Sequence, residues 1–375
     1  MIHFWTYFNE YKQYRPKFLN LIDKTLKRGK IFFGENLSTF EKNFRKKYKC
    51  KYAIAVGSGT DAILISLLSL NLKKGDEVIT ASNTAIPTIS AIVNSGAKPV
   101  LVDINDDYLI DINKLKKAIS KKTKVVIPVH LYGKACKMDE INNICKKKKI
   151  HIIEDCAQAQ GAKFMNKFVG TFGSLGCFSF YPTKILGGYG DGGLILTNNY
   201  KLYKNAKNIR FYGIDTVNNK NKFFKKYYSN INGVNSRLDE INSSILNFKL
   251  EKVDTFINKR RAIANIYDNA LKNTSLILPK KNELNFDVYH QYTVYHSKRN
   301  KITNALKKNG IETRIIYPYP IHKMKGYKTY FKDAKFINSE KKSKGIFCLP
   351  IYPDLKIKDV KLICKNIIKI MNYIN

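Results

Sequence analysis

The sequence is poor in acidic residues and has no long apolar run. Its 375 residues include 29 aspartates and glutamates against 67 lysines and arginines, which gives a formal charge of +38. No apolar stretch reaches the roughly 18 residues that a membrane helix needs. The first residues also lack the apolar core of a signal peptide. We therefore expect a cytoplasmic protein with no membrane partner.

Metal-binding cysteine patterns are missing as well. The seven cysteines are scattered, with no CxxC pair and no Cys/His cluster at zinc spacing. Scattered thiols in a long chain are typical of a reducing compartment and not of a disulfide scaffold. The sequence thus predicts no metal site.

The excess of lysine has two explanations. Basic residues that neutralise phosphates are typical of nucleic-acid-binding proteins, so a non-catalytic polyanion binder is one hypothesis. In this chain, however, lysines occur in almost every polar segment, and the longest run, Lys146 to Lys149, lies at the predicted end of a helix. A solvated surface without a nucleic-acid partner explains that spread better. The positive electrostatic potential of such a surface would also favour small phosphorylated substrates.

Short apolar runs alternate with amphipathic stretches from about residue 53 to residue 200. Strands are predicted at 53–56, 77–80, 99–104, 124–131, 151–155, 176–181 and 193–198. Helices are predicted at 60–70, 84–95, 111–119 and 137–147. This alternation predicts an α/β fold in which helices cover both faces of a mostly parallel sheet. Only a glycine-rich stretch joins the last two strands, so one of them should be antiparallel.

The pattern changes after about residue 240. A long helix, continuous or broken, is predicted over 236–272. Further strands are predicted at 292–296, 313–318 and 346–352, with helices at 300–310 and from about 357. We infer a large α/β domain over residues 1–245 and a smaller C-terminal α+β domain over residues 246–375.

The segment VGSGTDA, residues 56–62, is the first candidate site. A predicted strand ends here, two glycines allow a tight turn, and Thr60 begins a helix. Backbone N–H groups at the start of a helix can bind a phosphate. A hydroxyl cap beside a glycine turn gives the same pattern, so the segment alone leaves both interpretations open.

The segment HIIEDCAQAQGA, residues 151–162, is the second candidate. Asp155 lies at the end of a predicted strand, where ligands collect in open α/β sheets, and Gln158 follows about one helical turn later. A carboxylate there can hold a proton on a heterocyclic nitrogen. The alternative is a carboxylate that caps the next segment.

The segment CFSFYPTKILGGYGDGG, residues 177–193, is the third candidate. Gly188, Gly190 and Gly193 form a GxGxxG pattern, but a dinucleotide-binding fold needs a helix after it and here a strand is predicted. What remains is Lys184 between a strand and flexible backbone. A buried lysine loses its proton readily and can serve as a nucleophile and proton carrier, whereas most loop lysines are simply solvated.

Together, the three segments match the needs of pyridoxal 5′-phosphate. Its phosphate needs a helix start, its pyridine nitrogen needs an acid, and its aldehyde needs an amine. An acid beside the nitrogen keeps the ring cationic, so the ring withdraws electrons from the carbon that is deprotonated. The sequence therefore predicts an enzyme that uses pyridoxal 5′-phosphate, with Lys184 as the catalytic residue.

On these residues the sequence resembles the DegT/DnrJ family of sugar aminotransferases, which depend on pyridoxal phosphate and have fold type I, the aspartate aminotransferase-like fold. The resemblance extends over nearly the whole chain. It includes GSGTDA, GDEVIT, GAKPVLVDI, PVHLYGK, EDCAQAQGA, FSFYPTK, GDGG, NSRLDEI and YPYPIH. It implies an aminotransferase that exchanges an amino group between L-glutamate and a nucleotide-linked keto sugar.

The resemblance also implies roles for individual residues. Lys184 would bind the cofactor aldehyde and act as general base, Asp155 would pair with the pyridine nitrogen, and Gln158 would contact the ring hydroxyl. Asn235 would reach the phosphate of a neighbouring subunit, which implies a homodimer with shared active sites. The full set of expected cofactor-binding residues is Gly59, Thr60, Asp155, Gln158, Ser179, Lys184 and Asn235.

Two positions depart from the family pattern. Ala85 lies where many members place an aromatic residue against the cofactor ring, so the stacking residue is not identified. Gln160 lies where other members have histidine, and we assign it no role. The branch of dehydratases has histidine in place of the lysine, and Lys184 argues against that branch.

The substrate assignment rests on resemblance alone. FYG (211–213), GVNSRLDEI and NTAIPT are most similar to members that aminate C3 of a dTDP-3-keto-6-deoxyhexose, and amination at C4 is the alternative. Four side chains are candidates for the sugar site, with core or interface packing as the alternative for each: Tyr181, Tyr317, Tyr319 and His322.

Overall fold

The computed structural model describes residues 1–215 and 228–374. The first part of the chain forms α1 (Phe8–Lys27), α2 (Glu35–Lys47), β1 (Tyr52–Val56), α3 (Gly59–Ser69), β2 (Glu77–Ala81), α4 (Ile86–Asn94), β3 (Lys98–Val102), α5 (Ile112–Ala118), β4 (Thr123–Ile127), the 3₁₀ turn η1 (Leu131–Gly133), α6 (Met138–Lys148), β5 (His151–Asp155), β6 (Lys163–Phe164), β7 (Lys167–Phe168), β8 (Leu175–Ser179), β9 (Gly193–Thr197) and α7 (Tyr200–Ile209). The second part forms α8 (Glu240–Leu271), β10 (Asn285–Phe286), β11 (Tyr292–Tyr295), α9 (Arg299–Lys308), η2 (Ile321–Lys323), η3 (Lys328–Phe331), α10 (Ile337–Gly345), β12 (Ile346–Leu349) and α11 (Ile357–Ile374).

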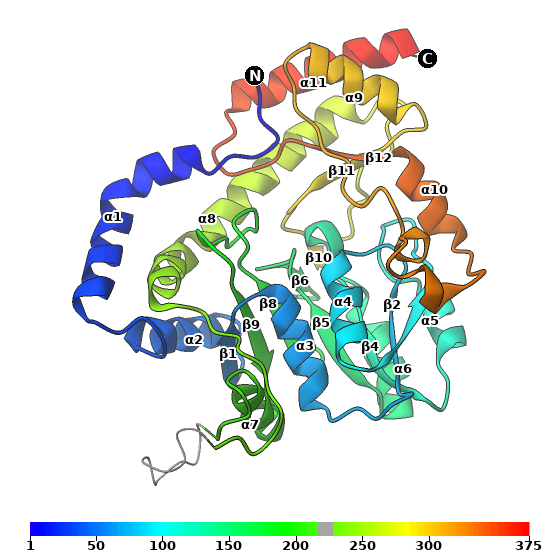
Figure 1. The fold of residues 1–375 in the computed structure, drawn as a ribbon. Coiled ribbons are helices and arrows are strands. Elements are labelled where there is room, and N and C mark those ends of the chain that lie inside the picture. Colours follow the sequence, from blue (N-terminus) through cyan, green and yellow to red (C-terminus); the bar gives the residue numbers. More distant parts are fainter. Residues whose placement is uncertain (216–227, 375) are drawn as a thin grey trace.

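A seven-stranded sheet forms the centre of the large domain (Figure 1). Its strand order is β1-β9-β8-β5-β4-β2-β3. Neighbours from β8 to β3 pair in parallel, whereas β9 is antiparallel to both β8 and β1. The predicted α/β fold, with one reversed strand beside the glycine-rich stretch, is therefore confirmed.

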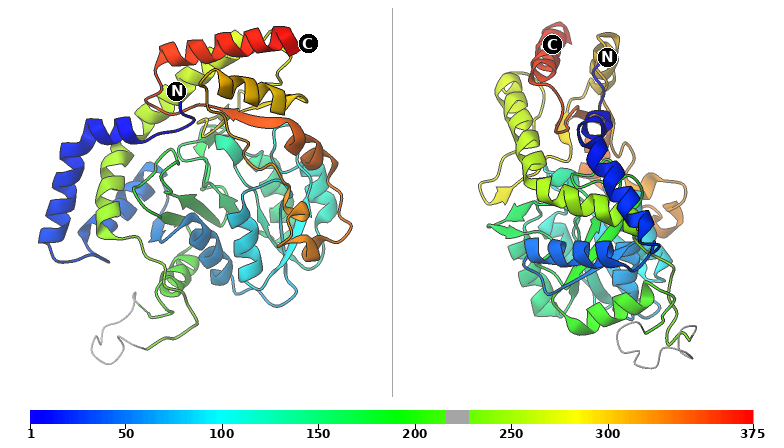
Figure 2. Two further views of the ribbon diagram at one scale, coloured as in Figure 1. Left: turned by 45° about the horizontal axis from the view of Figure 1, so that its top comes forward. Right: turned by 90° about the vertical axis from the view of Figure 1, so that its left-hand side faces the viewer.

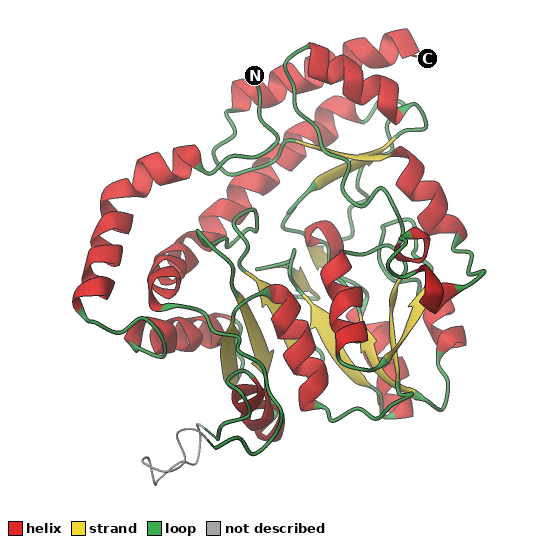
Figure 3. Cartoon of the chain, viewed as in Figure 1, coloured by secondary structure: helices red, strands yellow, loops and turns green. Residues whose placement is uncertain are grey.

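Helices cover both faces of this sheet, as the secondary-structure view shows (Figure 3). One apolar layer joins the sheet to α2, α5, α6 and α8, and the other joins it to α3, α4 and α7. Because side chains alternate along a strand, Ala53 and Ala55 of β1 enter the first layer while Ile54 and Val56 enter the second. Both faces are thus buried, which explains the continuous apolar runs in the sequence.

The C-terminal residues form a smaller layer above the sheet (Figure 2). Its core contains Tyr267 of α8, Tyr292 of β11, Phe347 of β12 and Ile363 of α11. The long helix α8 runs from the large domain into this layer without a break. The predicted domain boundary at residues 245/246 falls within α8 and stays a prediction.

Two parts of the chain differ from the expectations. The segment 313–318 forms no regular strand, because only Arg314 pairs with Cys348 and the backbone of Tyr317 is left-handed with φ of 60°. Helices α1 and α2 were not predicted, although Leu37, Phe40 and Phe44 of α2 recur at helical spacing on its buried face. No helix in the described part of the chain combines the length and apolarity that a bilayer span requires.

Candidate active site

The three candidate segments meet at the carboxyl edge of the sheet. A cavity of about 350 Å³ lies there, above the ends of β1, β5 and β8. Six of the seven expected cofactor-binding residues line it: Gly59, Thr60, Asp155, Gln158, Ser179 and Lys184. Segments more than a hundred residues apart thus form one site, as expected for ligands at strand ends in open α/β sheets.

One wall of the cavity is the start of α3. Ser58 caps this helix, since its Oγ accepts the N–H of Asp61 at 3.1 Å. Gly59 has no room for a side chain, because a Cβ there would lie 2.6 Å from the Cβ of Ser179. The helix start and the Ser179 hydroxyl therefore lie side by side, and the free N–H groups of the first turn make this wall suited to an anion.

A further network holds this wall in place. The hydroxyl of Ser236 accepts the N–H of Gly57 at 2.8 Å and donates to the carboxylate of Asp61 at 2.7 Å. Ser236 belongs to the NSRLDEI segment, which is far from α3 in sequence. Sequence reasoning did not identify this contact, because nothing in either segment signals the other.

Asp155, the last residue of β5, also lines the cavity. Its Oδ2 accepts the hydroxyl of Thr88 at 2.8 Å, and its Oδ1 accepts the N–H of Ala157 at 3.1 Å. Burial raises the pKa of Asp155, while these two hydrogen bonds and the charge of Lys184 oppose that rise. The carboxylate is therefore fixed in orientation and able to accept one more hydrogen bond from a protonated ring nitrogen.

Lys184 lies in the turn that follows β8. Its backbone N–H donates to the carbonyl of Tyr181 at 2.8 Å, and its side chain lines the cavity. Burial lowers the pKa of its amine to about 8, against the opposing effect of Asp155. A substantial share of the amine is thus neutral and nucleophilic near pH 8.

Gln158 is held from two directions. Its Oε1 accepts the backbone N–H of Tyr132 at 2.8 Å, and its Nε2 donates to the hydroxyl of Tyr317 at 2.7 Å. The rings of Tyr132 and Tyr317 stack, with centroids 6.2 Å apart and planes at 28°. The amide expected at the cofactor ring is therefore positioned by both halves of the molecule.

The structure separates the four sugar-site candidates. Tyr181 and Tyr317 line the cavity. Tyr319 lies outside its lining and is 66% exposed. His322 is buried elsewhere, with its Nε2 2.9 Å from the Glu340 carboxylate and its ring against Phe336, an arrangement that supports the fold.

Asn235, the seventh expected cofactor ligand, is exposed and lies outside the cavity lining of this chain. Its backbone pairs with Phe211 in an isolated bridge. Its predicted role therefore depends on a second subunit.

Several residues near the site had no assigned role in the sequence. Thr88 orients Asp155, and Gln160 donates to the backbone carbonyl of Ser179 at 2.5 Å. Ala85, Ile86 and Pro87 form an apolar part of the cavity wall, at the place where an aromatic ring was looked for. The contact between Gln160 and Ser179 joins two of the recognised motifs, EDCAQAQGA and FSFYPTK.

A buried polar cluster supports the end of β5. Glu154 accepts the N–H groups of Gly170, Phe172 and Gly173 at 2.6–2.7 Å and contacts His130 Nε2 at 3.1 Å. The other ring nitrogen of His130 accepts the N–H of Cys136, so the proton resides on Nε2. Among the described residues, His130, Glu154 and Cys156 are the group with metal-ligand spacing, but the hydrogen bonds of His130 and Glu154 serve to hold the backbone.

The donor set of the cavity fits pyridoxal 5′-phosphate. The cavity brings together a buried carboxylate, an amine of lowered pKa and a helix start beside a hydroxyl, which correspond to its pyridine nitrogen, aldehyde and phosphate. The close approach at Gly59 shows that the start of α3 packs directly against Ser179.

Known proteins show the same architecture over the whole chain. The chain is 35% identical over 358 residues to the dTDP-3-amino-3,4,6-trideoxy-alpha-D-glucose transaminase of Micromonospora megalomicea subsp. nigra. This match covers 94% of this chain and 94% of the relative. The chain is 38% identical over 351 residues to the dTDP-3-amino-3,6-dideoxy-alpha-D-galactopyranose transaminase of Aneurinibacillus thermoaerophilus, covering 93% of this chain and 94% of the other. The solved structure of S. venezuelae DesV, in complex with a ketimine intermediate, superposes with a TM-score of 0.94 at 30% identity and covers 100% of this chain and 99% of that one.

The family comparison extends over most of the sequence as well, since the sequence profile matches residues 12–368. The predictions of a fold-type I enzyme, of pyridoxal phosphate as cofactor and of a nucleotide-sugar aminotransferase are thereby confirmed. The chain belongs to the DegT/DnrJ/EryC1/StrS aminotransferase family.

Proposed function

We propose that this enzyme transfers an amino group from L-glutamate to C3 of a dTDP-3-keto-6-deoxyhexose. The observation that carries the proposal is the single cavity in which Lys184, Asp155 and the start of α3 meet. The names of the two relatives above, both transaminases of dTDP-3-amino sugars, support the choice of C3 and of dTDP.

The cofactor supplies the chemistry that no side chain has. Bound pyridoxal phosphate provides an electron-withdrawing ring and the carbon that carries the amino group between the two substrates. A solved relative, ntda from Bacillus subtilis at 31% identity, contains the aminated form of this cofactor. Asp155, the start of α3 and Ser179 would hold it, and Gln158 would contact its ring hydroxyl.

The residues of the chain bind, orient and move protons. Lys184 Nζ would hold the cofactor by its aldehyde and would move the proton at the α-carbon of the amino donor. Its lowered pKa makes the neutral amine available near neutral pH. Thr88 and Ala157 fix the orientation of the Asp155 carboxylate, which would hold the proton on the ring nitrogen of the cofactor.

We also propose a cytoplasmic homodimer in which each subunit completes the other's site. The exposed Asn235 lies outside the cavity of its own chain. If Asn235 serves the partner's cavity, mixing the inactive variants Lys184→Ala and Asn235→Ala restores activity, because one site of each mixed dimer is then intact. No restored activity in verified mixed dimers would contradict a shared site.

The substrate is tested by product analysis. The holoenzyme is incubated with L-glutamate and a panel of 3-keto and 4-keto nucleotide sugars, and the amino sugar is examined by NMR. We expect 2-oxoglutarate in equal amount to a product aminated at C3. Relatives named for UDP- and GDP-linked sugars make the nucleotide part of the same test. Amination at C4 alone would replace the proposed substrate but leave the aminotransferase assignment in place.

A further inference from the structure

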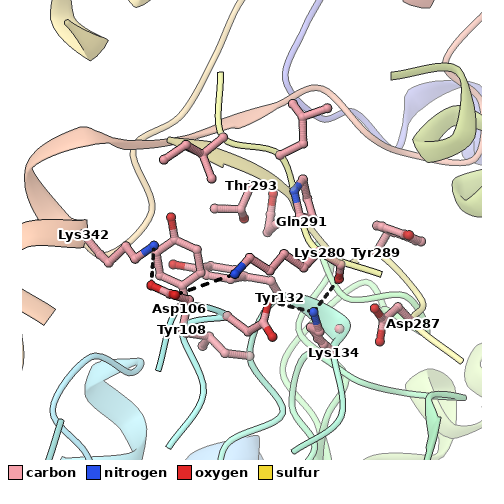
Figure 4. Close-up of a pocket in the computed structure, with 16 residues that line it drawn as sticks. Asp106, Tyr108, Tyr132, Lys134, Lys280, Asp287, Tyr289, Gln291, Thr293 and Lys342 are labelled. Atoms are coloured by element: carbon pink, nitrogen blue, oxygen red, sulfur yellow. Dashed lines mark hydrogen bonds and ion pairs between the residues drawn. The ribbon is translucent and has the colours of Figure 1, made fainter. Parts of the chain in front are cut away.

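A second cavity lies behind the cofactor cavity, between the large and the small domain (Figure 4). It has a volume of about 270 Å³. The large domain contributes the segments 106–108 and 131–134, and the small domain contributes parts of 277–293 and Lys342 of α10. Among the described residues, the two cavities have no lining residue in common.

Aromatic and aliphatic side chains line the middle of this second cavity. Tyr108 and Tyr132 line it, with ring centroids 5.7 Å apart and planes at 81°. Tyr289, Leu278 and Pro279 complete this apolar part. Such a lining suits a planar ring, which gains contact area on aromatic faces.

One end of the cavity carries surplus positive charge. The ammonium groups of Lys342 and Lys280 lie 3.3 Å and 3.7 Å from the same carboxylate, that of Asp106, as Figure 4 shows by dashed lines. Asp106 is 66% exposed, so it pairs only weakly with either lysine. Lys342, by contrast, is only 12% exposed. Two ammonium groups that share one solvated carboxylate leave room for an anionic ligand group.

The other end carries an acid, Asp287, which lies near the charges of Lys134 and Arg261 but has one oxygen left for a ligand. Asp287 lies at the opposite side of the cavity from Lys342 (Figure 4). Its buried Oδ1 has no hydrogen-bond partner in the part of the chain that the structure describes, and burial raises its pKa to about 6. The neighbouring Lys134 is already bound to Asp107 at 2.9 Å and to the carbonyl of Lys280 at 2.5 Å. A buried acceptor without a partner is costly, and a ligand N–H would satisfy it.

We propose that this second cavity is a binding site for a nucleoside monophosphate. Its base lies against Tyr108 and Tyr132 with a ring N–H directed at Asp287, and its phosphate lies at Lys280 and Lys342. The order of features along the cavity, an acid, aromatic rings and then paired lysines, matches the order of N–H donor, planar base and anion in that ligand. The volume is small among ligand sites, which are typically about 300–1,000 Å³, so it suits a monophosphate better than a whole nucleotide sugar.

The position of Tyr132 connects this site with catalysis. Its side chain lines the second cavity, while its backbone N–H holds Gln158 in the cofactor cavity. Its backbone is left-handed, with φ of 60°, which is uncommon for a residue other than glycine. A ligand that moves the Tyr132 ring therefore changes the position of Gln158, and occupancy of the site should alter the rate of the half-reaction with glutamate.

The probe for the site is 5-iodouridine 5′-monophosphate with the holoenzyme. Crystals soaked in it are measured for anomalous scattering, because the iodine marks the base directly. We expect an iodine peak in the second cavity, beside the rings of Tyr108 and Tyr132, whatever is bound in the cofactor cavity. Calorimetry should show a binding event that uridine alone and inorganic phosphate alone fail to reproduce.

Matched variants test the two ends of the site. Asp287→Asn and Lys342→Met should each raise the Kd of 5-iodouridine 5′-monophosphate about tenfold or more, since each removes a charged partner of the ligand. Glu283→Gln and Lys341→Met remove neighbouring exposed charges and should leave it unchanged. Because Lys342 also contacts the rings of Tyr108 and Tyr295, Lys280→Met is measured as a second variant of that end.

Several outcomes would overturn the proposal. An iodine peak in the cofactor cavity alone, or no peak at all, would show that the second cavity does not take this ligand. Equal affinity in wild type, Asp287→Asn and Lys342→Met would do the same. Binding without any change in the half-reaction would refute the connection through Tyr132. Amination of keto sugars is measured separately, so a failure here is distinguishable from a failure of the proposed function.

Discussion

The cofactor cavity and the cavity behind Tyr132 have similar volumes, about 350 Å³ and 270 Å³, but they are built differently. The first collects side chains from the carboxyl ends of neighbouring strands, and nearly all of its lining comes from the large domain. The second is enclosed by loops of the large domain on one side and by the small domain on the other (Figure 4).

This difference determines how each cavity can be recognised. A strand that ends in a functional residue leaves a short contiguous motif, such as the one that ends in Asp155. A cavity between two domains is assembled from single residues of unconnected segments, so Asp287 and Lys342 have no motif. The comparison also teaches that Tyr132 connects the two cavities, because its side chain lines the second and its backbone N–H holds Gln158, which lines the first.

The largest expected effect is the loss of turnover when Lys184 is replaced, because only the cofactor cavity carries out the reaction. Lys184→Ala should lose the visible absorption of the bound cofactor and reduce turnover by about 10⁴-fold or more, because no other group in the cavity replaces its amine. Binding at the second cavity should persist in this variant. The measurements are the absorption spectrum and 2-oxoglutarate formation, with the exposed Lys201→Ala as control. A fully active Lys184→Ala enzyme would refute the assigned role.

The next effect concerns the buried carboxylate that supports the cofactor cavity. In the wild type, both carboxylate oxygens of Glu154 accept hydrogen bonds from backbone N–H groups. Glu154→Gln replaces one of these oxygens by an NH₂ group, which cannot accept them. We expect a loss of about 3 kcal/mol in the free energy of unfolding, measured by urea denaturation. Glu251→Gln, at an exposed site of α8, should change it little. Equal stability of the two variants would contradict a supporting role for Glu154.

A smaller effect is expected for the residue that orients Asp155. Thr88→Val removes the hydroxyl that donates to Asp155 and should lower kcat about tenfold, whereas Thr88→Ser keeps the donor and most of the activity. The pH dependence of the cofactor's visible band should shift in the valine variant only. Equal kcat and equal pH dependence in Thr88→Val and Thr88→Ser would show that the Thr88 hydroxyl does not orient Asp155.

The smallest effect tests the acid of the second cavity. The folded-state pKa of Asp287 is raised to about 6, so ionisation of this group costs stability as the pH rises from about 4 through 6. Asp287→Asn removes that cost and should raise the free energy of unfolding by about 1 kcal/mol at pH 8, with little effect at pH 4. Urea denaturation at both pH values measures the difference. A destabilised variant at pH 8 would mean that Asp287 already has a partner.

Much of the fold follows from local pattern. The strands that begin at residues 52 and 151 and the helix that begins at Gly59 are readable because apolar runs, alternation and turn glycines act over a few residues. The segment 313–318 is the counterexample. It is apolar enough for a strand, but Tyr317 is left-handed, and its side chain is used to hold Gln158.

For the site, the sequence by itself determined the reactive groups. Lys184, Asp155 and the start of α3 are recognisable because their chemistry requires particular residue types beside a strand end or a glycine turn. Only the tertiary structure decided what surrounds them: Thr88 on Asp155, Ser236 on Asp61, and Tyr317 but not His322 at the cavity. The physical reason is distance along the chain, because a hydrogen bond between residues far apart leaves no trace in the sequence near either partner.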